Sequence, residues 1–143
     1  MGTFANGITT SFKTEIGEGT HVLSTDVIKI ALYSEDATIT KATTAYSATN
    51  EISGTGYTAG GATMALSSGY PATNADNNRE YRFDAVTWAT ASFTARAALI
   101  YNSSKSNRSI RVIDFGQNRT VVAGDFVVRV PTTMPAPIII ASG

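Results

Sequence analysis

The run of alternating apolar and polar residues from Ala85 to Pro131 constrains the fold most. Within it, residues 92–101 place an apolar or small side chain at every second position, as a strand with one face on a core does. The polar stretch NSSKSNRS at 102–109 then predicts a hairpin tip. Further strands are predicted at 109–115, 119–122 and 125–130, separated by turns at FGQN and at Ala123-Gly124. Pro131 ends the pattern because proline donates no ladder hydrogen bond.

Shorter strand signals precede this run. The segment DVIKIALY at 26–33 predicts a strand with Ile28, Ile30 and Leu32 inward and Lys29 outward. A strand is also predicted at 62–66, after a tight turn at Gly60-Gly61, with weak strand content near 44–48. Residues 80–88 change the parity of their bulky side chains, which predicts a β-bulge near Asp84-Ala85.

The two ends of the chain carry different signals. Residues 1–7 read as an N-terminal arm, and Ile8, Phe12 and Ile16 lie four apart, which suits either a helical stripe or one face of a strand. We favour a short helix over 8–19, because Thr9 or Thr10 can cap its start and Gly17 can end it. The Pro- and Ile-rich segment 131–143 contains Ile138, Ile139 and Ile140, too apolar for a free tail. It adds a strand either to its own sheet or to a neighbouring subunit, and the sequence favours neither.

Together these signals predict an all-β fold: an antiparallel β-sandwich of jelly-roll or Ig-like type, with a short N-terminal helix and extended termini. Seven to nine short strands joined by Gly and Asn turns are typical of that architecture. The length of 143 residues fits one domain spanning 1–143, and only 15% of residues are charged.

Composition weighs against several classes of function. Eleven basic and eleven acidic residues give zero net charge, so no long-range field favours nucleic acid or an anionic membrane. Without cysteine there is neither a disulfide nor a thiolate metal site. We see no signal peptide, and no apolar run approaches the ~20 residues of a membrane span.

Chemistry-bearing residues are few, and structural interpretations are favoured for them. Arg96 lies in an apolar run, and a buried charge requires a partner, so we predict a structural ion pair with Asp114 or Asp125. His21, the sole histidine, is interpreted as a surface residue in a loop. It offers too few companions for a zinc site or a catalytic triad. Asn74, Asp76, Asn78 and Glu80 resemble the start of a calcium loop, but a solvated turn is the better interpretation because the rest of that motif is missing.

Contacts with partners are expected at loop tips and chain ends. Lys105, Arg108 and Arg111 form a small basic patch at the predicted hairpin tip, which is usually a solvated feature. Phe4 and the three isoleucines 138–140 supply apolar ends, with an intramolecular contact favoured for Phe4.

Four segments carry a resemblance to a known type of protein: DVIKIALY, GYTAGGATMAL, AVTWATASFTARAALIYN and, above all, VIDFGQNRTVVAGDFVVRV. The chain resembles small virion structural proteins of tailed bacteriophages over about Phe12 to Val130. That resemblance implies a non-enzymatic capsid decoration or cement protein without metal or cofactor, which binds copies of itself and the major capsid protein or other virion proteins. It implies assembly in the host cytoplasm, a virion location and a homo-oligomer, with a trimer expected for a shell with threefold positions. The alternative is a tail fibre, spike or adhesin module that binds host glycan through loop tyrosines such as Tyr46, Tyr57 or Tyr70. An enzyme such as a depolymerase is disfavoured.

Overall fold

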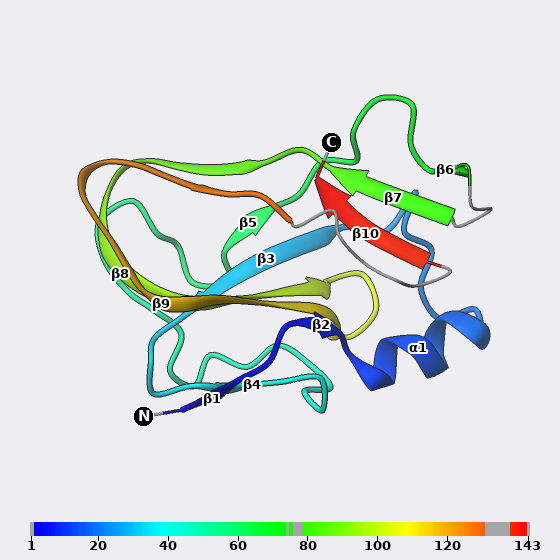
Figure 1. The fold of residues 1–143 in the computed structure, drawn as a ribbon, viewed down its shortest axis with the longest axis horizontal. Coiled ribbons are helices and arrows are strands. Elements are labelled where there is room, and N and C mark those ends of the chain that lie inside the picture. The colour runs from blue at the N-terminus through cyan, green and yellow to red at the C-terminus, as the bar shows by residue number, and fades with distance from the viewer. Residues whose placement is uncertain (1, 74, 76–78, 131–137, 143) are drawn as a thin grey trace.

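The computed structural model describes residues 2–73, 75, 79–130 and 138–142. Over these residues it contains one helix and ten strands (Figure 1). The helix is α1 (Thr10–Gly17), and the longer strands are β3 (Ile28–Tyr33), β7 (Arg79–Phe83), β8 (Val86–Asn102), β9 (Arg108–Val128) and β10 (Ile138–Ser142). Five strands have two residues each: β1 (Thr3–Phe4), β2 (Gly7–Ile8), β4 (Thr38–Ile39), β5 (Ala62–Thr63) and β6 (Ala72–Thr73). The described strands are therefore more numerous than the seven to nine expected.

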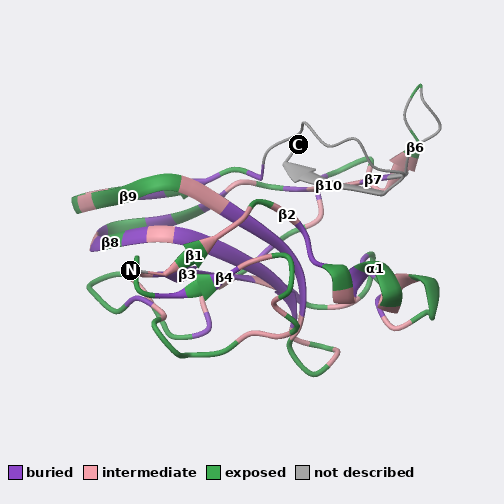
Figure 2. Cartoon of the chain, turned by 60° about the horizontal axis from the view of Figure 1, so that its bottom comes forward, coloured by how far each residue is buried: buried purple, intermediate pink, exposed green. Residues whose placement is uncertain are grey.

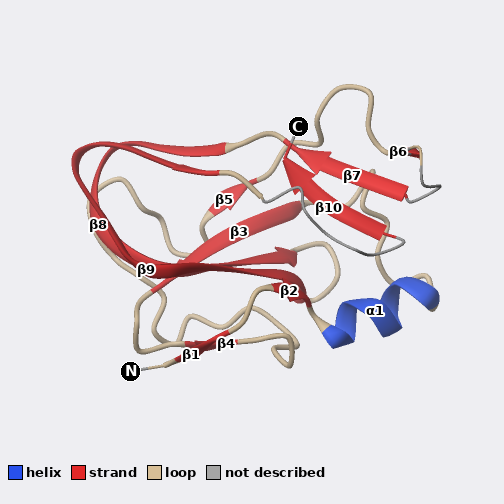
Figure 3. Cartoon of the chain, in the orientation of Figure 1, coloured by secondary structure: helices blue, strands red, loops and turns tan. Residues whose placement is uncertain are grey.

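The main sheet is antiparallel and has the strand order β2-β9-β8-β3-β5. A second sheet has the order β10-β7-β6, and β1 pairs with β4. The β10–β7 and β1–β4 pairs are parallel, which a purely antiparallel sandwich would not contain. Figure 3 shows the single helix lying beyond the ends of the strands. The predicted all-β, sandwich-like fold with a short N-terminal helix is confirmed.

Strands β8 and β9 form a long hairpin that bends back over itself. In Figure 1 both strands run along the lower layer, curve at one end of the molecule, and return towards β7 and β10. The predicted turns at FGQN and Ala123-Gly124 are wrong, because both lie inside β9. Gly116, with φ of 80°, and Ala123, with φ of 47°, bend the strand without reversing the chain. Register shifts against β8 on both sides of Ala91 bend it further, as β-bulges do.

The main sheet is buried on both faces (Figure 2). One face of β3 and β8 contributes Ile30 and Ile100 to the larger core, which the returning limbs of the hairpin cover. The opposite face contributes Tyr33 and Leu99 to a smaller core beneath β1 and β4. The expected alternation of buried and solvent-facing residues in β3 is therefore incomplete, since five of its six residues are buried and Lys29 is half-buried. Burial of each large apolar side chain in these cores contributes about 1.5–3 kcal/mol to the free energy of folding.

Helix α1 confirms the helical interpretation of residues 8–19. Thr9 precedes it with an extended backbone, and its hydroxyl accepts a hydrogen bond from the Phe12 amide at 3.4 Å. Phe12 is 1% exposed and packs into the larger core. The Thr9 N–H donates to the carbonyl of Ile110 at 2.9 Å, which ties the start of the helix to β9.

The parity change near Asp84-Ala85 has a different cause from the predicted β-bulge. Phe83 ends β7 and Val86 begins β8, so the chain passes from one sheet to another at this point. Both side chains are buried, and the Asp84 N–H donates to the Ala65 carbonyl at 2.8 Å. A strand break between sheets thus produces the same sequence pattern as a bulge.

The Gly60-Gly61 turn is confirmed. The φ angles of Gly60 and Gly61 are 93° and 82°, and the Gly61 N–H donates to the Thr58 carbonyl at 2.9 Å. A Cβ atom on Gly61 would lie 1.7 Å from the carbonyl oxygen of Ile30. Only glycine permits this close approach to β3.

Candidate functional site

Arg96 on β8 pairs with Asp114 on β9. The Arg96 Nη1 donates to Asp114 Oδ1, and the Asp114 carboxylate also accepts the Gly116 N–H at 2.8 Å. Burial acts to raise the pKa of Asp114, but these hydrogen bonds outweigh it and hold the pKa below its usual value. The Arg96 guanidinium also lies 4.6 Å from the centre of the Phe4 ring. Phe4 therefore contacts its own chain, as favoured from the sequence.

Asp125, the other predicted partner of Arg96, lies elsewhere on the hairpin. The pairing of Trp88 with Phe126 places Asp125 near the start of β8, whereas Arg96 lies near the bend. The side chain of Asp125 is exposed. The structure thus brings Arg96 to Asp114 and leaves Asp125 on a different part of the surface.

The basic residues of the hairpin tip contact carboxylates of the same chain. Lys105 Nζ lies 3.0 Å from Asp26 Oδ2, and Arg108 Nε donates to Glu15 Oε2 at 2.7 Å. Arg111 is 3% exposed, and burial lowers its pKa to about 10. The tip therefore offers less free positive charge than the sequence indicated.

His21 lies at the centre of a buried hydrogen-bond network. It is 4% exposed, so its interpretation as a surface residue is wrong. Its Nε2 lies 2.8 Å from Glu15 Oε1, and its Nδ1 lies 3.0 Å from the Asn102 amide nitrogen. Because the amide nitrogen of Asn102 can only donate, His21 Nδ1 accepts and Nε2 donates to Glu15. Asn102 Nδ2 also donates to Asp26 Oδ2 at 2.7 Å.

This network fastens the helix, the segment after it and the hairpin tip to one another. Burial acts to raise the pKa values of Glu15 and Asp26, but hydrogen bonds and nearby charges outweigh it and lower both. Both ring nitrogens of His21 are occupied by protein groups, so neither is available as a base. Among the described residues, no three His, Cys, Asp or Glu side chains gather in a way that could hold a metal ion. We therefore interpret the network as structural.

Glu51 is the centre of a second cluster, formed with tyrosines. It accepts hydrogen bonds from the Tyr46 hydroxyl at 2.7 Å, the Tyr57 hydroxyl at 2.6 Å and the Gly60 N–H at 2.8 Å. Tyr46 also stacks on Tyr101, with ring centres 4.7 Å apart. Burial, with the Glu51 charge, raises the pKa values of Tyr46 and Tyr57 far above that of free tyrosine. Two of the three tyrosines suggested for glycan binding are thus engaged within the fold.

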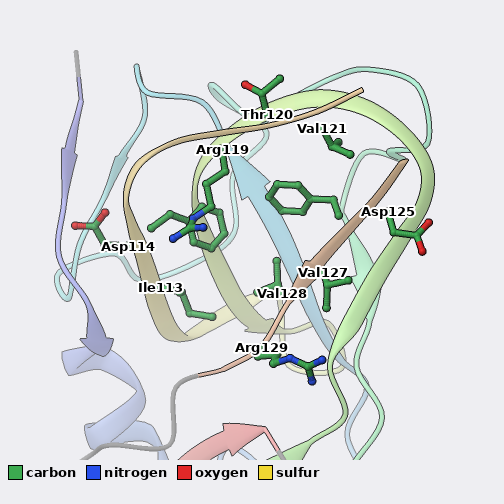
Figure 4. Close-up of a pocket in the computed structure, with 11 residues that line it drawn as sticks. Ile113, Asp114, Arg119, Thr120, Val121, Asp125, Val127, Val128 and Arg129 are labelled. Atoms are coloured by element: carbon green, nitrogen blue, oxygen red, sulfur yellow. The ribbon is translucent and has the colours of Figure 1, made fainter. Parts of the chain in front are cut away.

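A hollow of about 620 Å³ lies between the two limbs of the bent strand β9 (Figure 4). Three segments line it: 113–115 and 119–121 of β9, and 125–129, which ends one residue past that strand. Buried or half-buried apolar side chains such as Phe115 and Phe126 lie beside it, and the charged residues Arg119, Asp125 and Arg129 lie at its rim. The hollow therefore combines apolar surface with separated charges, as surfaces that bind other proteins do.

Four large apolar side chains are exposed in the described chain, two in the segment after α1 and two on β9. Val22 and Val27, 44% and 46% exposed, follow α1, and we call them the helix-side valines. Val122 and Val127, 79% and 47% exposed, lie on β9, and we call them the β9 valines. Figure 1 places α1 and the bend of β9 at opposite ends of the molecule, and Val127 lies on the limb that returns from the bend, opposite Thr87 of β8. These exposed valines could not be predicted from the sequence, because valine is equally common in buried strands.

The C-terminal isoleucines lie on a strand of their own chain. Ile138, Ile139 and Ile140 begin β10, which pairs in parallel with β7 from Ile138 opposite Arg79 to Ser142 opposite Phe83. This pairing is one of the two arrangements left open by the sequence. Residues 131–137 of the Pro- and Ile-rich segment lie outside the described residues, as do Asn74, Asp76 and Asn78 of the possible calcium loop. Glu80 is described, and it accepts a hydrogen bond from Arg82 Nε at 2.7 Å.

Comparison with protein-family models, curated protein sequences and solved structures gives no match to this chain. Within the described residues, no helix has both the length and the apolar character needed to cross a membrane.

Proposed function

We propose that this protein is a non-enzymatic virion structural protein of a tailed bacteriophage, and specifically a capsid decoration or cement protein. The observation that carries the proposal is the presence of two separate exposed apolar groups on one sheet scaffold, the helix-side valines and the β9 valines. A protein that joins neighbouring subunits of a shell needs at least two contact surfaces. The resemblance of 112–130 to virion proteins supports the same role, because this segment forms most of β9.

The mechanism in this proposal is mechanical. Copies of the protein bind the major capsid protein or other virion proteins, contact one another, and bury surface that shell expansion would expose again. A stable contact of this kind buries roughly 800 Å² on each partner. Many weak contacts on one shell combine through their high local concentration. Assembly takes place in the host cytoplasm, and the protein is then located in the virion.

The helix-side valines are the proposed contact with the shell. The network around His21 holds the segment that carries them, since the Val22 N–H donates to Asp26 Oδ2 at 2.8 Å and the Val27 N–H to Ser104 Oγ at 2.8 Å. Binding to a surface that is already ordered loses less conformational entropy.

The test uses shells of the encoding phage from which this protein has been stripped. We expect the purified protein to co-sediment with these shells and to raise the temperature at which they rupture. Val22→Lys with Val27→Lys should weaken this binding at least about tenfold, because charge is introduced into an apolar contact. A matched variant, Thr63→Lys on the exposed part of β5, should bind as the unmodified protein does. Failure of the unmodified protein to bind stripped shells, together with labelling of the tail, would refute the proposal in favour of the tail-module alternative.

A further inference from the structure

The outer edge of β9 is open for most of its length. Strand β2 pairs with this edge only at Arg111 and Val112, and the Asn6 side chain accepts the Asp114 N–H at 2.6 Å. Beyond Asp114, no other strand of the described chain pairs with this side of β9. An open edge presents unpaired N–H and C=O groups, which are a template for another strand.

Residues 125–129 follow the bend of β9 and extend one residue past the end of the strand at Val128. Burial alternates strictly, with Asp125, Val127 and Arg129 exposed and Phe126 and Val128 buried. Phe126, Val127 and Val128 pair with Trp88, Thr87 and Val86 of β8 without interruption, whereas Asp125 lies at the register shift between Trp88 and Ala91. The exposed face of the segment therefore carries an acidic residue, Asp125, then Val127, then a basic residue, Arg129.

A β-bulge limits this part of the edge on one side. Ala91 pairs with Gly124 and Phe93 with Val121, so two residues of β9, Val122 and Ala123, lie opposite one residue of β8. A bulge interrupts the ladder of hydrogen bonds and bends the strand, so the edge changes direction at this point. A strand that adds to this edge is therefore confined to the residues after the bulge.

We propose that residues 125–129 bind the same residues of a second copy as antiparallel edge strands, around a twofold axis at Val127. In this register Asp125 faces Arg129 of the second copy, Arg129 faces its Asp125, and the two Val127 side chains meet on the exposed face. Phe126 and Val128 of the two copies meet on the buried face, which continues the apolar core across the contact. The hollow between the limbs of β9 then lies against its counterpart in the second copy.

Charge selects this arrangement over others. Neither Asp125 nor Arg129 has a side-chain hydrogen bond or ion pair within the described chain, so both charges are available. Parallel pairing in register would place like charges opposite each other. An antiparallel slip of two residues would place either Asp125 or Arg129, depending on its direction, opposite Val127 and would form no opposite-charge pair. Only the proposed register forms two opposite-charge pairs. In it, the segment 125–129 is complementary in charge to the same segment of the second copy.

The contact is small, so we expect reversible dimers at protein concentrations of about 0.1–1 mM in solution. This inference does not depend on the virion role, because it concerns two copies of the protein alone. The helix-side valines lie outside the contact. Loss of shell binding and loss of self-association are therefore separate results.

Charge reversal in two single variants tests the proposal by sedimentation equilibrium. Asp125→Arg alone places two arginine pairs across the axis, and Arg129→Asp alone places two aspartate pairs there. We expect each variant to self-associate at least about tenfold more weakly than the unmodified protein. An equimolar mixture of the two variants restores both opposite-charge pairs and should dimerise again. The doubly reversed chain should also dimerise.

Two lysine variants provide a matched comparison. Val127→Lys puts two like charges at the axis and should weaken the dimer, whereas Val122→Lys, at the more exposed valine in the bulge, should leave it unchanged. Circular dichroism establishes that all variants fold. The proposal is overturned if the unmodified protein is monomeric at 1 mM, if the mixed variants fail to associate, or if Val122→Lys weakens the dimer as much as Val127→Lys. Capture of a different protein on this edge in place of a second copy would overturn it too.

Discussion

Substitution of Asn102 by alanine tests whether the His21 network holds the helix and the hairpin tip together. Asn102 is fully buried, and its side chain makes three hydrogen bonds. It donates to His21 Nδ1 at 3.0 Å and to Asp26 Oδ2 at 2.7 Å, and it accepts the Ser104 N–H at 3.0 Å. Asn102→Ala removes all three and leaves the buried ring nitrogen of His21 without its donor.

The expected loss follows from these bonds. A neutral hydrogen bond contributes about 0.5–1.5 kcal/mol net, and one to a charged group about 1.5–3 kcal/mol. Two neutral bonds and one bond to the Asp26 carboxylate give a loss of roughly 2.5–6 kcal/mol in the free energy of unfolding. This is a large part of the 5–15 kcal/mol that typically stabilises a domain.

Urea unfolding followed by circular dichroism measures this loss. Ser103→Ala is the control, because it removes one solvent-exposed hydrogen bond, from the Ser103 hydroxyl to the Val27 carbonyl at 2.9 Å. We expect the control to lose less than about 1 kcal/mol.

The pH dependence gives a second readout for Asn102→Ala. The pKa of Asp26 is lowered in the fold, so its contribution to stability is present above its unfolded pKa of about 4 and is lost as the pH falls through the folded pKa. Asn102→Ala removes one cause of the lowered pKa. The difference between the two proteins should therefore be larger at pH 7 than at pH 3. A loss below about 1 kcal/mol at pH 7, or a loss equal at both pH values, would refute the reasoning.

Three further substitutions probe other parts of the fold. Gly61→Ala should abolish folding or lower the free energy of unfolding by more than about 3 kcal/mol, because the new Cβ would collide with a backbone carbonyl of β3. The control Gly17→Ala, whose Cβ would meet no atom within 4 Å, should change thermal stability little. Arg96→Ala should raise the pKa of Asp114, measured by NMR titration, and lower stability by about 1 kcal/mol at neutral pH; an unchanged pKa would contradict the ion pair. Tyr57→Phe should cost about 2 kcal/mol in urea unfolding, because the hydroxyl both donates to a carboxylate and accepts a backbone N–H, and a neutral result would contradict that assignment.

Local patterns in the sequence predict the elements that depend on neighbouring residues. Helix α1 follows from Thr9 and the spacing of its apolar residues, and the turn at Gly60-Gly61 follows from glycine alone. Strand β3 was predicted, but its burial on both faces was not. The polar segment that covers its second face carries no periodic signal, so the position of that segment depends on tertiary packing.

The course of β9 shows why turns and bends are difficult to separate in a sequence. Gly116 and Ala123 have positive φ angles, as residues of tight turns do. Here, however, β8 continues alongside and forms pairs on both sides of each position. The presence of a long partner strand decides between a turn and a bend, and the local sequence does not contain that information.

The His21 network could not be predicted for a related reason. Its members, Glu15, His21, Asp26, Asn102 and Lys105, come from two parts of the chain about 80 residues apart, as the separation of Asp26 and Lys105 shows. Each residue type is common in loops, and nothing in the spacing marks the group. Arg96 and Asp114 were easier to pair, because a charge in an apolar run of a strand requires a partner on an adjacent strand.

The bend of the hairpin connects the core with the proposed contact at the edge of β9. Phe126 packs against Phe93 with ring centres 5.0 Å apart and against Trp88 at 6.2 Å, so aromatic contacts fix the limb that carries Asp125 and Arg129. A fixed limb presents its two charges at a constant separation, which a self-complementary contact requires. Loosening the limb from within should therefore weaken self-association without any change at the surface. Phe93→Leu, which keeps an apolar side chain but removes the ring contacts, should weaken the dimer in a protein that remains folded, and an unchanged dimer would show that the edge does not depend on the core beneath it.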